Sequence, residues 1–276
     1  MSAALILIDI DNTILFGEKP TDVSCTIWYG KGSYRFVSAH NIQLIRKMMA
    51  RPNTILALMT GRRFSNYEPV SRTVPHHFAI LEHGGEIVYG SVGGDSLRRV
   101  FAKIASVPTV DHPLWQFQNH LGSMGFRTER LDRKCSFRVM PSEEGSQPKN
   151  LAEVVRSAIE GTSFASYVVV VQNESFVDVI PSWSGKLSAA RRIVDALEWP
   201  SFATFAAGDG HNDLEVLEWA DWSYCATNAV PEVQSIVRFK GGFVSPQEGH
   251  LGASDVLEKL NGDVAQLLLG HNDASL

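Results

Sequence analysis

The feature that most constrains this chain is a short apolar run near its start that ends in two aspartates. Residues 3–8 are all apolar, and Asp9 and Asp11 follow with one residue between them. The run is short for a helix and rich in Ile and Leu, which predicts a fully buried strand in the middle of a parallel sheet. Ligands bind outside the carboxyl ends of the strands in such sheets, so both aspartates are expected at the functional edge.

Two carboxylates so close together repel each other unless a cation lies between them or one of them holds a proton. Mg²⁺ prefers oxygen ligands of this kind. A simpler interpretation is a strand that ends in a solvated Asp-Asn turn, and the pattern Asp-x-Asp-x-Thr by itself does not exclude it. The choice between the two depends on what the rest of the chain supplies.

Composition limits the class of protein. With 276 residues, 44% of them hydrophobic, the chain can bury a large core or two modest ones. The net charge of −5 and the absence of a basic run argue against nucleic acid as a partner. Three widely spaced cysteines, no positively charged leader and no long apolar stretch predict a cytoplasmic protein without a membrane segment. Composition predicts nothing about the oligomeric state.

Buried strands alternate with helical patterns over much of the chain. Strands are expected at 54–59, 78–81 and 202–207 in addition to the first one, with helices between them. This order predicts an α/β fold, a doubly wound, Rossmann-like core with a mainly parallel sheet. Residues 16–38 interrupt the pattern, and two short strands around Gly30-Lys31-Gly32 predict a β-hairpin flap over the first strand.

The sequence pattern changes between residues 86 and 181, where apolar residues alternate more with polar ones and strands are expected to pair with strands. We therefore predict a core domain made of residues 1–85 and 182–276, with an α+β cap domain, 86–181, inserted into it. The elements expected in the cap are strands at 86–89, 136–140, 167–172 and 175–180, helices at 97–106, 114–124 and 150–159, and a tight turn at 173–174.

The strand ends carry the residue types that phosphoryl transfer needs. Asp9 is a candidate nucleophile, because a carboxylate can form an aspartyl-phosphate intermediate. Asp11 is placed to protonate the leaving oxygen and afterwards to accept a proton from water. Thr60 offers a hydroxyl group, and Gly61 a closely approaching backbone N–H, to phosphate oxygens.

Two later segments supply further charge. Lys186, near the start of a predicted helix, offers a positive charge to the phosphoryl group. Asp209, held between two glycines, is a candidate Mg²⁺ ligand. Asp213 lies one helical turn further on and could bind the ion directly or through water.

Each of these residues also has a simpler interpretation. Lys186 taken alone fits an ordinary surface lysine, and Thr60-Gly61 fits a plain strand-to-helix turn. The run 209–213 resembles a calcium loop, but it follows a buried strand and lacks the later glutamate of an EF-hand. The functional interpretation depends on all of them occurring together, in this order, each at the end of an element.

The chain resembles phosphatases of the haloacid dehalogenase (HAD) superfamily, in the branch with a large α+β cap of the C2 type between the second and third motifs. That branch includes Cof-type, sucrose-phosphate and mannosyl-3-phosphoglycerate phosphatases. The resemblance is carried by residues 9–13 (Asp-Ile-Asp-Asn-Thr), 58–62 (Leu-Met-Thr-Gly-Arg), Lys186 and 208–213 (Gly-Asp-Gly-His-Asn-Asp). Residues 81–85 are similar to the Glu-Asn-Gly turn that precedes this cap.

The resemblance implies a Mg²⁺ ion held by Asp9, the backbone carbonyl of Asp11, and Asp209, with Asp213 close by. It also implies a cap that closes over the substrate. Such closure suits phosphoryl transfer, which depends on positioning and charge neutralisation in a site shielded from water.

Two asparagines belong to these motifs. Asn212 is assigned to phosphate binding with the fourth motif. Asn12 stands where the superfamily usually has glycine, and asparagine tolerates the unusual backbone angles of such a position.

Substrate specificity is expected to come from the cap, and the substrate to be a small phosphorylated molecule, a sugar phosphate or a phosphorylated sugar acid. One stretch of the cap is rich in basic residues that could contact such a substrate or form a solvated face, namely Arg127, Arg130, Lys134 and Arg138. The residues that we select as candidates near the substrate are Arg62, Glu82, His83, Arg138 and Trp183.

Three other functions share the motifs or the fold. A sugar phosphomutase would transfer phosphate between hydroxyl groups without releasing it. A non-catalytic ligand sensor would keep the fold, although all expected catalytic residues are present here. A dehalogenase is disfavoured, because Asp11 and the Mg²⁺ carboxylates would have no use in it.

Overall fold

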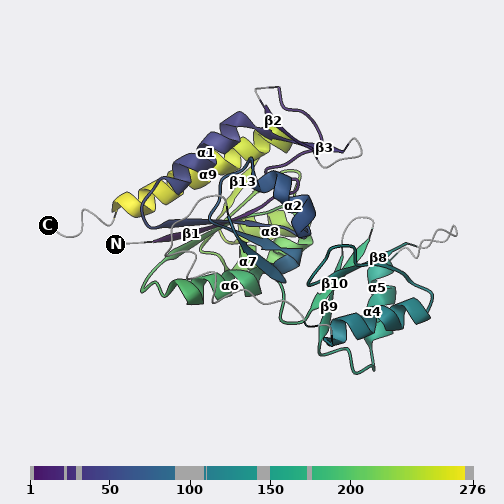
Figure 1. The fold of residues 1–276 in the computed structure, drawn as a ribbon. Helices are drawn as coiled ribbons and strands as arrows, with labels where there is room; N and C mark the ends of the chain where they lie inside the picture. The colour runs from purple at the N-terminus through teal and green to yellow at the C-terminus, as the bar shows by residue number, and fades with distance from the viewer. Residues whose placement is uncertain are drawn as a thin grey trace.

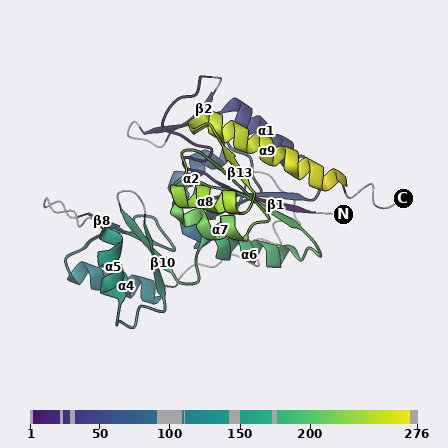
Figure 2. The same cartoon turned by 180° about the vertical axis from the view of Figure 1, so that it is seen from behind.

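The chain folds around a seven-stranded sheet with helices on both faces, next to a smaller lobe (Figures 1 and 2). The computed structural model describes residues 3–21, 24–28, 33–90, 109, 111–141, 150–172 and 176–270. The large sheet has the order β13-β12-β11-β1-β4-β5-β6, and every neighbouring pair except β5 and β6 is parallel. Its strands are β1 Ala4–Asp9, β4 Thr54–Met59, β5 Phe78–Leu81, β6 Glu86–Tyr89, β11 Ala203–Ala207, β12 Trp222–Ala226 and β13 Phe243–Ser245.

Strand β1 lies in the centre of this sheet, and all six of its residues are buried. Its side chains alternate between the two faces, so that Ile6 and Ile8 pack into one apolar core while Leu5 and Leu7 pack into the other. This explains why the sequence reads as a continuous apolar run. The predicted central strand and the predicted doubly wound α/β class are confirmed.

Two helical layers cover the sheet (Figure 1). One face packs against α1 Ala39–Met49, α2 Phe64–Ser71 and α9 Gly249–Gly270, and the other against α6 Lys186–Leu197, α7 Leu214–Trp219 and α8 Pro231–Phe239. Helix α1 begins after Ser38, whose hydroxyl group accepts a hydrogen bond from the backbone N–H of His40. Helix α9 is much longer than a sequence pattern near 253–260 indicates.

Strand β6 corrects the predicted division of the chain. The sequence predicts residues 86–89 as part of the cap domain, but they pair antiparallel with β5 and form the edge of the large sheet. The chain reverses its direction in the short η1 turn, Glu82–Gly84, and β6 therefore lies directly beside β5. Pairing with the neighbouring strand satisfies the backbone groups of β5, which would otherwise form an open edge.

The smaller lobe contains a four-stranded antiparallel sheet of order β7-β8-β10-β9. Its elements are α4 Pro113–Ser123, β7 Arg127–Glu129, β8 Phe137–Met140, α5 Leu151–Ile159, β9 Val168–Gln172 and β10 Val177–Pro181. Both helices pack on one face of this sheet and share an apolar core with it. The helix expected at 97–106 and the turn expected at 173–174 lie outside the described residues.

The turn between β5 and β6 touches the segment that leads from the smaller lobe back into α6, at a pair of glycines. A Cβ atom on Gly84 would lie 2.0 Å from the backbone oxygen of Gly185, so no side chain fits there. Both glycines also have positive φ angles, 97° and 136°, which favour glycine. The two backbones touch directly at this contact, and this requires glycine at position 84.

The predicted flap is a two-stranded antiparallel hairpin, β2 Ser24–Trp28 and β3 Tyr34–Ser38. It lies beyond the N-terminal end of α1 in Figure 1. Its predicted turn, 30–32, falls outside the described residues. Among the helices of the described part of the chain, none combines the length and apolarity needed to cross a bilayer.

Two buried histidines before β5 make stability depend on pH. Burial lowers the pKa of His76 and of His77 to about 4. The ring nitrogen Nδ1 of His77 accepts a hydrogen bond from the backbone N–H of Leu56 at 3.0 Å, which requires the neutral ring. Because the unfolded chain binds these protons more readily, their stabilising contribution is complete above about pH 6.5 and is lost as the pH falls towards 4.

We expect His77→Asn to reduce this pH dependence, since an asparagine oxygen can accept from Leu56 but does not titrate. Between pH 7.5 and pH 5 the free energy of unfolding should fall by about 2 kcal/mol less in the variant than in the wild type. Urea denaturation at both pH values measures the difference. An identical fall in the two proteins would contradict the assignment.

Candidate active site

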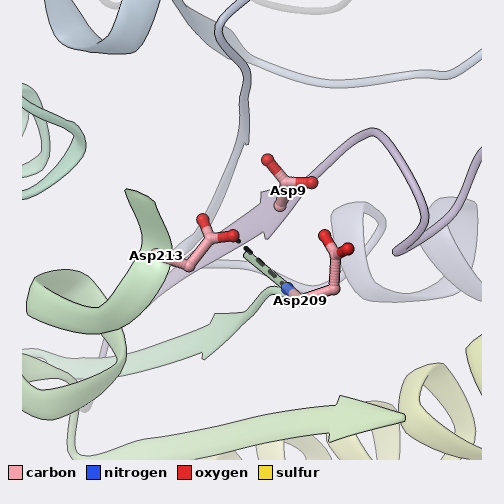
Figure 3. Close-up of side chains that lie close together, drawn as sticks. All are labelled: Asp9, Asp209 and Asp213. Atoms are coloured by element: carbon pink, nitrogen blue, oxygen red, sulfur yellow. Dashed lines mark hydrogen bonds between the residues drawn. The ribbon is translucent and has the colours of Figure 1, made fainter. Parts of the chain in front are cut away.

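Three carboxylates meet at the carboxyl edge of the large sheet (Figure 3). Asp9 ends β1, Asp209 follows the neighbouring strand β11, and Asp213 ends the short η2 turn, His211–Asp213. One carboxylate oxygen from each of them lies within 4.8 Å of the others. The sheet order explains the convergence, because β1 and β11 are parallel neighbours although they are far apart in sequence.

The buried Lys186 ammonium group joins two of these carboxylates. Its Nζ atom lies 2.5 Å from Asp9 Oδ1 and 2.6 Å from Asp213 Oδ1. Lys186 is the first residue of α6, so the helix start places it directly beneath the carboxyl edge. The simpler interpretation of Lys186 as an ordinary surface lysine is excluded, since only 3% of the residue is exposed.

Burial and mutual repulsion oppose the ionisation of this cluster. Burial raises the pKa of Asp9 well above its ordinary value, although Lys186 counteracts the effect. Burial, together with the nearby Asp213 carboxylate, raises the pKa of Asp209 to about 7. For Lys186, burial favours the neutral amine, but Asp213 and Asp9 outweigh it and raise the pKa of the ammonium group.

The cluster suits a divalent cation. Lys186 supplies one positive charge to three acidic groups, and the raised pKa of Asp209 indicates that further positive charge is needed to keep it ionised at neutral pH. Carboxylate oxygens are ligands that Mg²⁺ prefers. Thr13, which is not among the residues selected from the sequence, belongs to the same cluster. Its Oγ1 atom lies 3.4 Å from Asp9 Oδ2 and 3.2 Å from Asp209 Oδ1.

Asp11 points to a different partner. Both of its carboxylate oxygens accept hydrogen bonds from Arg62, at 2.8 Å from Nε and 2.5 Å from an Nη atom. Asn12, the next residue, has a φ of 55°, as expected for a position where glycine is usual. The two candidate carboxylates of the first motif are thus held by separate cations, Asp9 by Lys186 and Asp11 by Arg62.

A cavity of about 610 Å³ opens above these residues. It is lined by most of the residues selected from the sequence, namely Asp9, Asp11, Thr60, Gly61, Arg62, His83, Arg138, Asp209 and Asn212. The hydroxyl group of Thr60 accepts a hydrogen bond from the backbone N–H of Arg62 at 3.0 Å, which shapes the turn after β4. Arg35 of the flap also lines the cavity.

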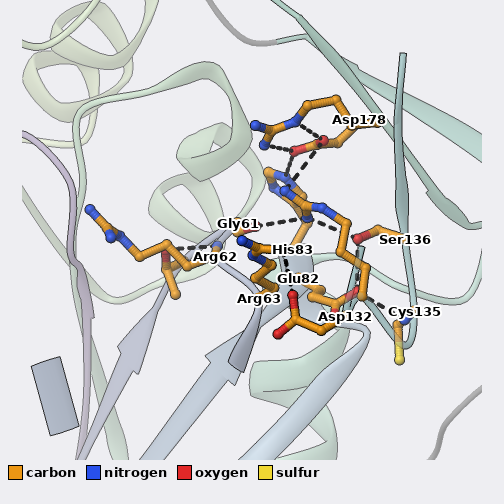
Figure 4. A network of polar contacts seen from close by, with 12 residues as sticks. Gly61, Arg62, Arg63, Glu82, His83, Asp132, Cys135, Ser136 and Asp178 are labelled. Atoms are coloured by element: carbon orange, nitrogen blue, oxygen red, sulfur yellow. Dashed lines mark hydrogen bonds and ion pairs between the residues drawn. The ribbon is translucent and has the colours of Figure 1, made fainter. Parts of the chain in front are cut away.

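The smaller lobe contributes a buried polar network to the cavity wall (Figure 4). Arg138 and Asp178 are directly opposite each other on β8 and β10, and both face away from the apolar core of the lobe. Arg138 donates two hydrogen bonds to Asp178, at 2.9 and 3.2 Å, and its guanidinium carbon lies 3.2 Å from the centre of the Phe176 ring. Asp178 and Arg133 were not selected from the sequence. A single carboxylate inside an apolar strand is the signal that could have identified Asp178.

Four selected residues are not among the described residues that line the cavity: Lys186 and Asp213, which are buried beside Asp9, and Glu82 and Trp183. The Glu82 carboxylate is fully buried and accepts hydrogen bonds from the backbone N–H groups of Lys134 and Cys135 and from the Ser136 hydroxyl group. Trp183 faces Arg192 on α6, with 5.6 Å between the guanidinium carbon and the ring centre. Neither residue is among the described residues that line the cavity. The structure therefore gives both of them contacts at the junction of the lobes.

Comparison with known proteins agrees with the site geometry. Residues 2–240 match the family model described as sucrose-6F-phosphate phosphohydrolase. The chain belongs to this family. The predicted relationship to HAD-type phosphatases is thereby confirmed.

Solved structures with the same fold include other phosphatases. BT1666 of Bacteroides thetaiotaomicron, a phosphatase of the HAD superfamily, aligns over 95% of this chain and 96% of its own, with a TM-score of 0.65 and 18% identity. The sucrose-phosphatase of Synechocystis sp. PCC6803 aligns over 96% of this chain and 99% of its own, with a TM-score of 0.60 and 16% identity. At these identities the likeness shows the fold.

Sequence relatives match over shorter segments. YkrA, a candidate phosphatase of Bacillus subtilis (strain 168), is 31% identical over 77 residues, which cover 28% of this chain and 30% of the relative. YxeH of the same organism is 29% identical over 94 residues, which cover 34% of each chain. The matched segments thus span about a third of the length of these two relatives.

We expect Lys186→Met to destabilise the metal-free protein, because it leaves the buried Asp9 and Asp213 without their counter-ion. The loss in the free energy of unfolding should be about 3 kcal/mol, as is typical when one partner of a buried ion pair is removed. Urea denaturation with a chelator present measures it. Lys259→Met, which removes an exposed i, i+4 ion pair with Asp263, is the control and should cost less than about 1 kcal/mol.

Mg²⁺ should stabilise the folded chain if the acidic cluster binds it. We expect the melting temperature to rise with Mg²⁺ concentration, and Asp209→Asn to remove most of that rise, since a ligand of the folded state stabilises it by mass action. Differential scanning calorimetry with and without Mg²⁺ tests this. Asp111→Asn, an exposed carboxylate of the smaller lobe, is the matched control and should respond like the wild type.

Proposed function

We propose that the protein is a Mg²⁺-dependent phosphomonoester hydrolase that acts through an aspartyl-phosphate on a small phosphorylated sugar or sugar acid. The observation that carries the proposal is the cluster of Asp9, Asp209 and Asp213 with the Lys186 ammonium group 2.5 Å from the Asp9 carboxylate. This arrangement supplies a nucleophile and the positive charge that a phosphoryl group requires.

In the first step, a carboxylate oxygen of Asp9 attacks phosphorus, and the bond between phosphorus and the ester oxygen breaks. The leaving oxygen takes a proton from Asp11, which releases an alcohol. Lys186 reduces the negative charge that repels the incoming phosphoryl group from the Asp9 carboxylate. The main-chain N–H of Gly61 and the side chain of Asn212, which line the same cavity, are available to the phosphoryl oxygens.

In the second step, Asp11 takes a proton from a water molecule whose oxygen attacks phosphorus. The bond between phosphorus and Asp9 breaks, which releases inorganic phosphate and restores the carboxylate. Both oxygens of Asp11 are paired with Arg62 in the structure, so this ion pair has to open before Asp11 can transfer protons. We infer that a bound phosphorylated substrate competes for Arg62.

Asp9, Asp209 and Asp213 would hold the Mg²⁺ ion of such an enzyme, with the backbone carbonyl of Asp11 as a further ligand. The ion would supply charge neutralisation for the phosphoryl group. The geometric support is the distance of at most 4.8 Å between their ligand atoms.

The substrate proposal is supported by both the cavity and the comparisons. A volume of about 610 Å³ suits a sugar-sized molecule. The related sucrose-phosphatase of Synechocystis was solved in complex with sucrose and phosphate, which favours a sugar-bearing substrate here as well.

Phosphate release from a panel of sugar phosphates, measured with Mg²⁺, tests the proposal. We expect Asp9→Asn to lower kcat by at least about 10³-fold, because a neutral amide cannot serve as the nucleophile. Circular dichroism and the melting temperature should show that the variant is folded, and Asp111→Asn should keep the wild-type rate.

Other outcomes would identify other functions. Transfer of phosphate to a second hydroxyl group of the sugar, without release, would establish a mutase. Binding of a sugar phosphate without turnover would establish a sensor. Hydrolysis by Asp9→Asn at the wild-type rate would refute the role of Asp9 while leaving the protein a phosphatase.

A further inference from the structure

The short turn between β5 and β6 has an unusual backbone. Glu82, His83 and Gly84 have φ angles of 47°, 55° and 97°, so two non-glycine residues in succession adopt left-handed conformations. Such conformations cost free energy and persist where surrounding contacts impose them. Here the backbone N–H of Glu82 donates to the carbonyl of Arg62 at 3.0 Å, and that of His83 donates to the carbonyl of Thr60 at 3.1 Å. The turn is therefore fixed to the loop that follows β4.

This backbone directs the His83 ring to the centre of three groups that line the cavity. Its Nε2 atom lies 3.0 Å from Asp178 Oδ2, and its Nδ1 atom lies 3.4 Å from the side-chain amide of Asn212. The ring also covers Gly61, where an added Cβ atom would lie 2.3 Å from His83 Cε1. His83 thus contacts both segments proposed to bind phosphate, and a carboxylate of the smaller lobe.

Asp178 extends this contact across the smaller lobe (Figure 4). It is 1% exposed, and besides His83 it accepts hydrogen bonds from Arg138. Burial opposes its ionisation, but the hydrogen bonds from His83 and Arg138 keep its pKa below the ordinary value. The neighbouring Arg133 lies 3.8 Å from Asp178 and donates to the carbonyl of Gly61 at 3.4 Å. The network therefore links Asp178 back to the loop that follows β4.

We propose that His83 is a positioning residue, and that its contact with Asp178 couples the placement of the smaller lobe to phosphate binding by Gly61 and Asn212. The inference rests on the proposed function, since it assumes that this cavity binds a phosphoryl group. When His83 and Asp178 are in contact, Gly61, Asn212 and Arg138 share one arrangement around the cavity. When the contact breaks, the two lobes can separate and the phosphate-binding groups lose their common support.

This coupling predicts more than a structural role. A residue that only stabilises the junction would change the free energy of unfolding and leave phosphate affinity intact. A positioning residue changes the affinity for phosphate, and does so through Asp178. Removal of either partner should then cost nearly as much affinity as removal of both, since the two act as a unit.

The test is a double-mutant cycle with inorganic phosphate as the probe and the full chain in Mg²⁺. His83→Asn is chosen because asparagine tolerates the left-handed backbone but is too short to reach Asp178. Asp178→Asn removes the charge with little change of shape, and serves as the independent variant if the other folds poorly. His40→Asn, an exposed histidine that does not line the cavity, is the matched control.

Calorimetry should give a dissociation constant for phosphate about 10-fold higher in each single variant, and about 10-fold rather than 100-fold higher in the double variant. The kcat/KM for p-nitrophenyl phosphate should follow the same pattern. Unchanged affinity in both single variants, or effects that multiply in the double variant, would overturn the inference. A wild-type protein that binds phosphate without hydrolysing any ester would refute the proposed function, yet the cycle would still decide the role of His83.

Discussion

The interaction on which the rest of the site depends is the buried ion pair of Lys186 with Asp9 and Asp213. Concentrating carboxylates in a place without water is unfavourable unless positive charge accompanies them. One ammonium group is too little for three acids, and this deficit of positive charge suits the proposed divalent ion.

The order of the strands brings acidic residues that are far apart in the sequence together at this site. Residues separated by about 200 positions become neighbours because β11 pairs directly with β1 in the middle of the sheet. This part of the architecture was accessible from the sequence. Each central strand is a mostly apolar run that is followed by polar or charged residues. The position of these residues at one edge follows from the geometry of parallel sheets.

The parts that the sequence did not reveal depend on registers and packing. Residues 86–89 are typical of a strand in either sheet, and the tight η1 turn decides that they join β5. The partnership of Arg138 with Asp178 depends on the pairing register of β8 and β10, which no local pattern encodes. Likewise, the sequence predicts Glu82 near the substrate, yet its left-handed backbone turns the carboxylate towards Lys134, Cys135 and Ser136.

The contact between Gly84 and Gly185 has a consequence for the lysine of the acidic cluster. It seats the segment that returns from the smaller lobe directly against the turn between β5 and β6, with no room for a Cβ atom on Gly84. Lys186 follows Gly185 at once as the first residue of α6, so the place of its ammonium group beside Asp9 depends on this close approach. A methyl group at position 84 would push the two backbones apart and draw the lysine away from the carboxylates that it neutralises.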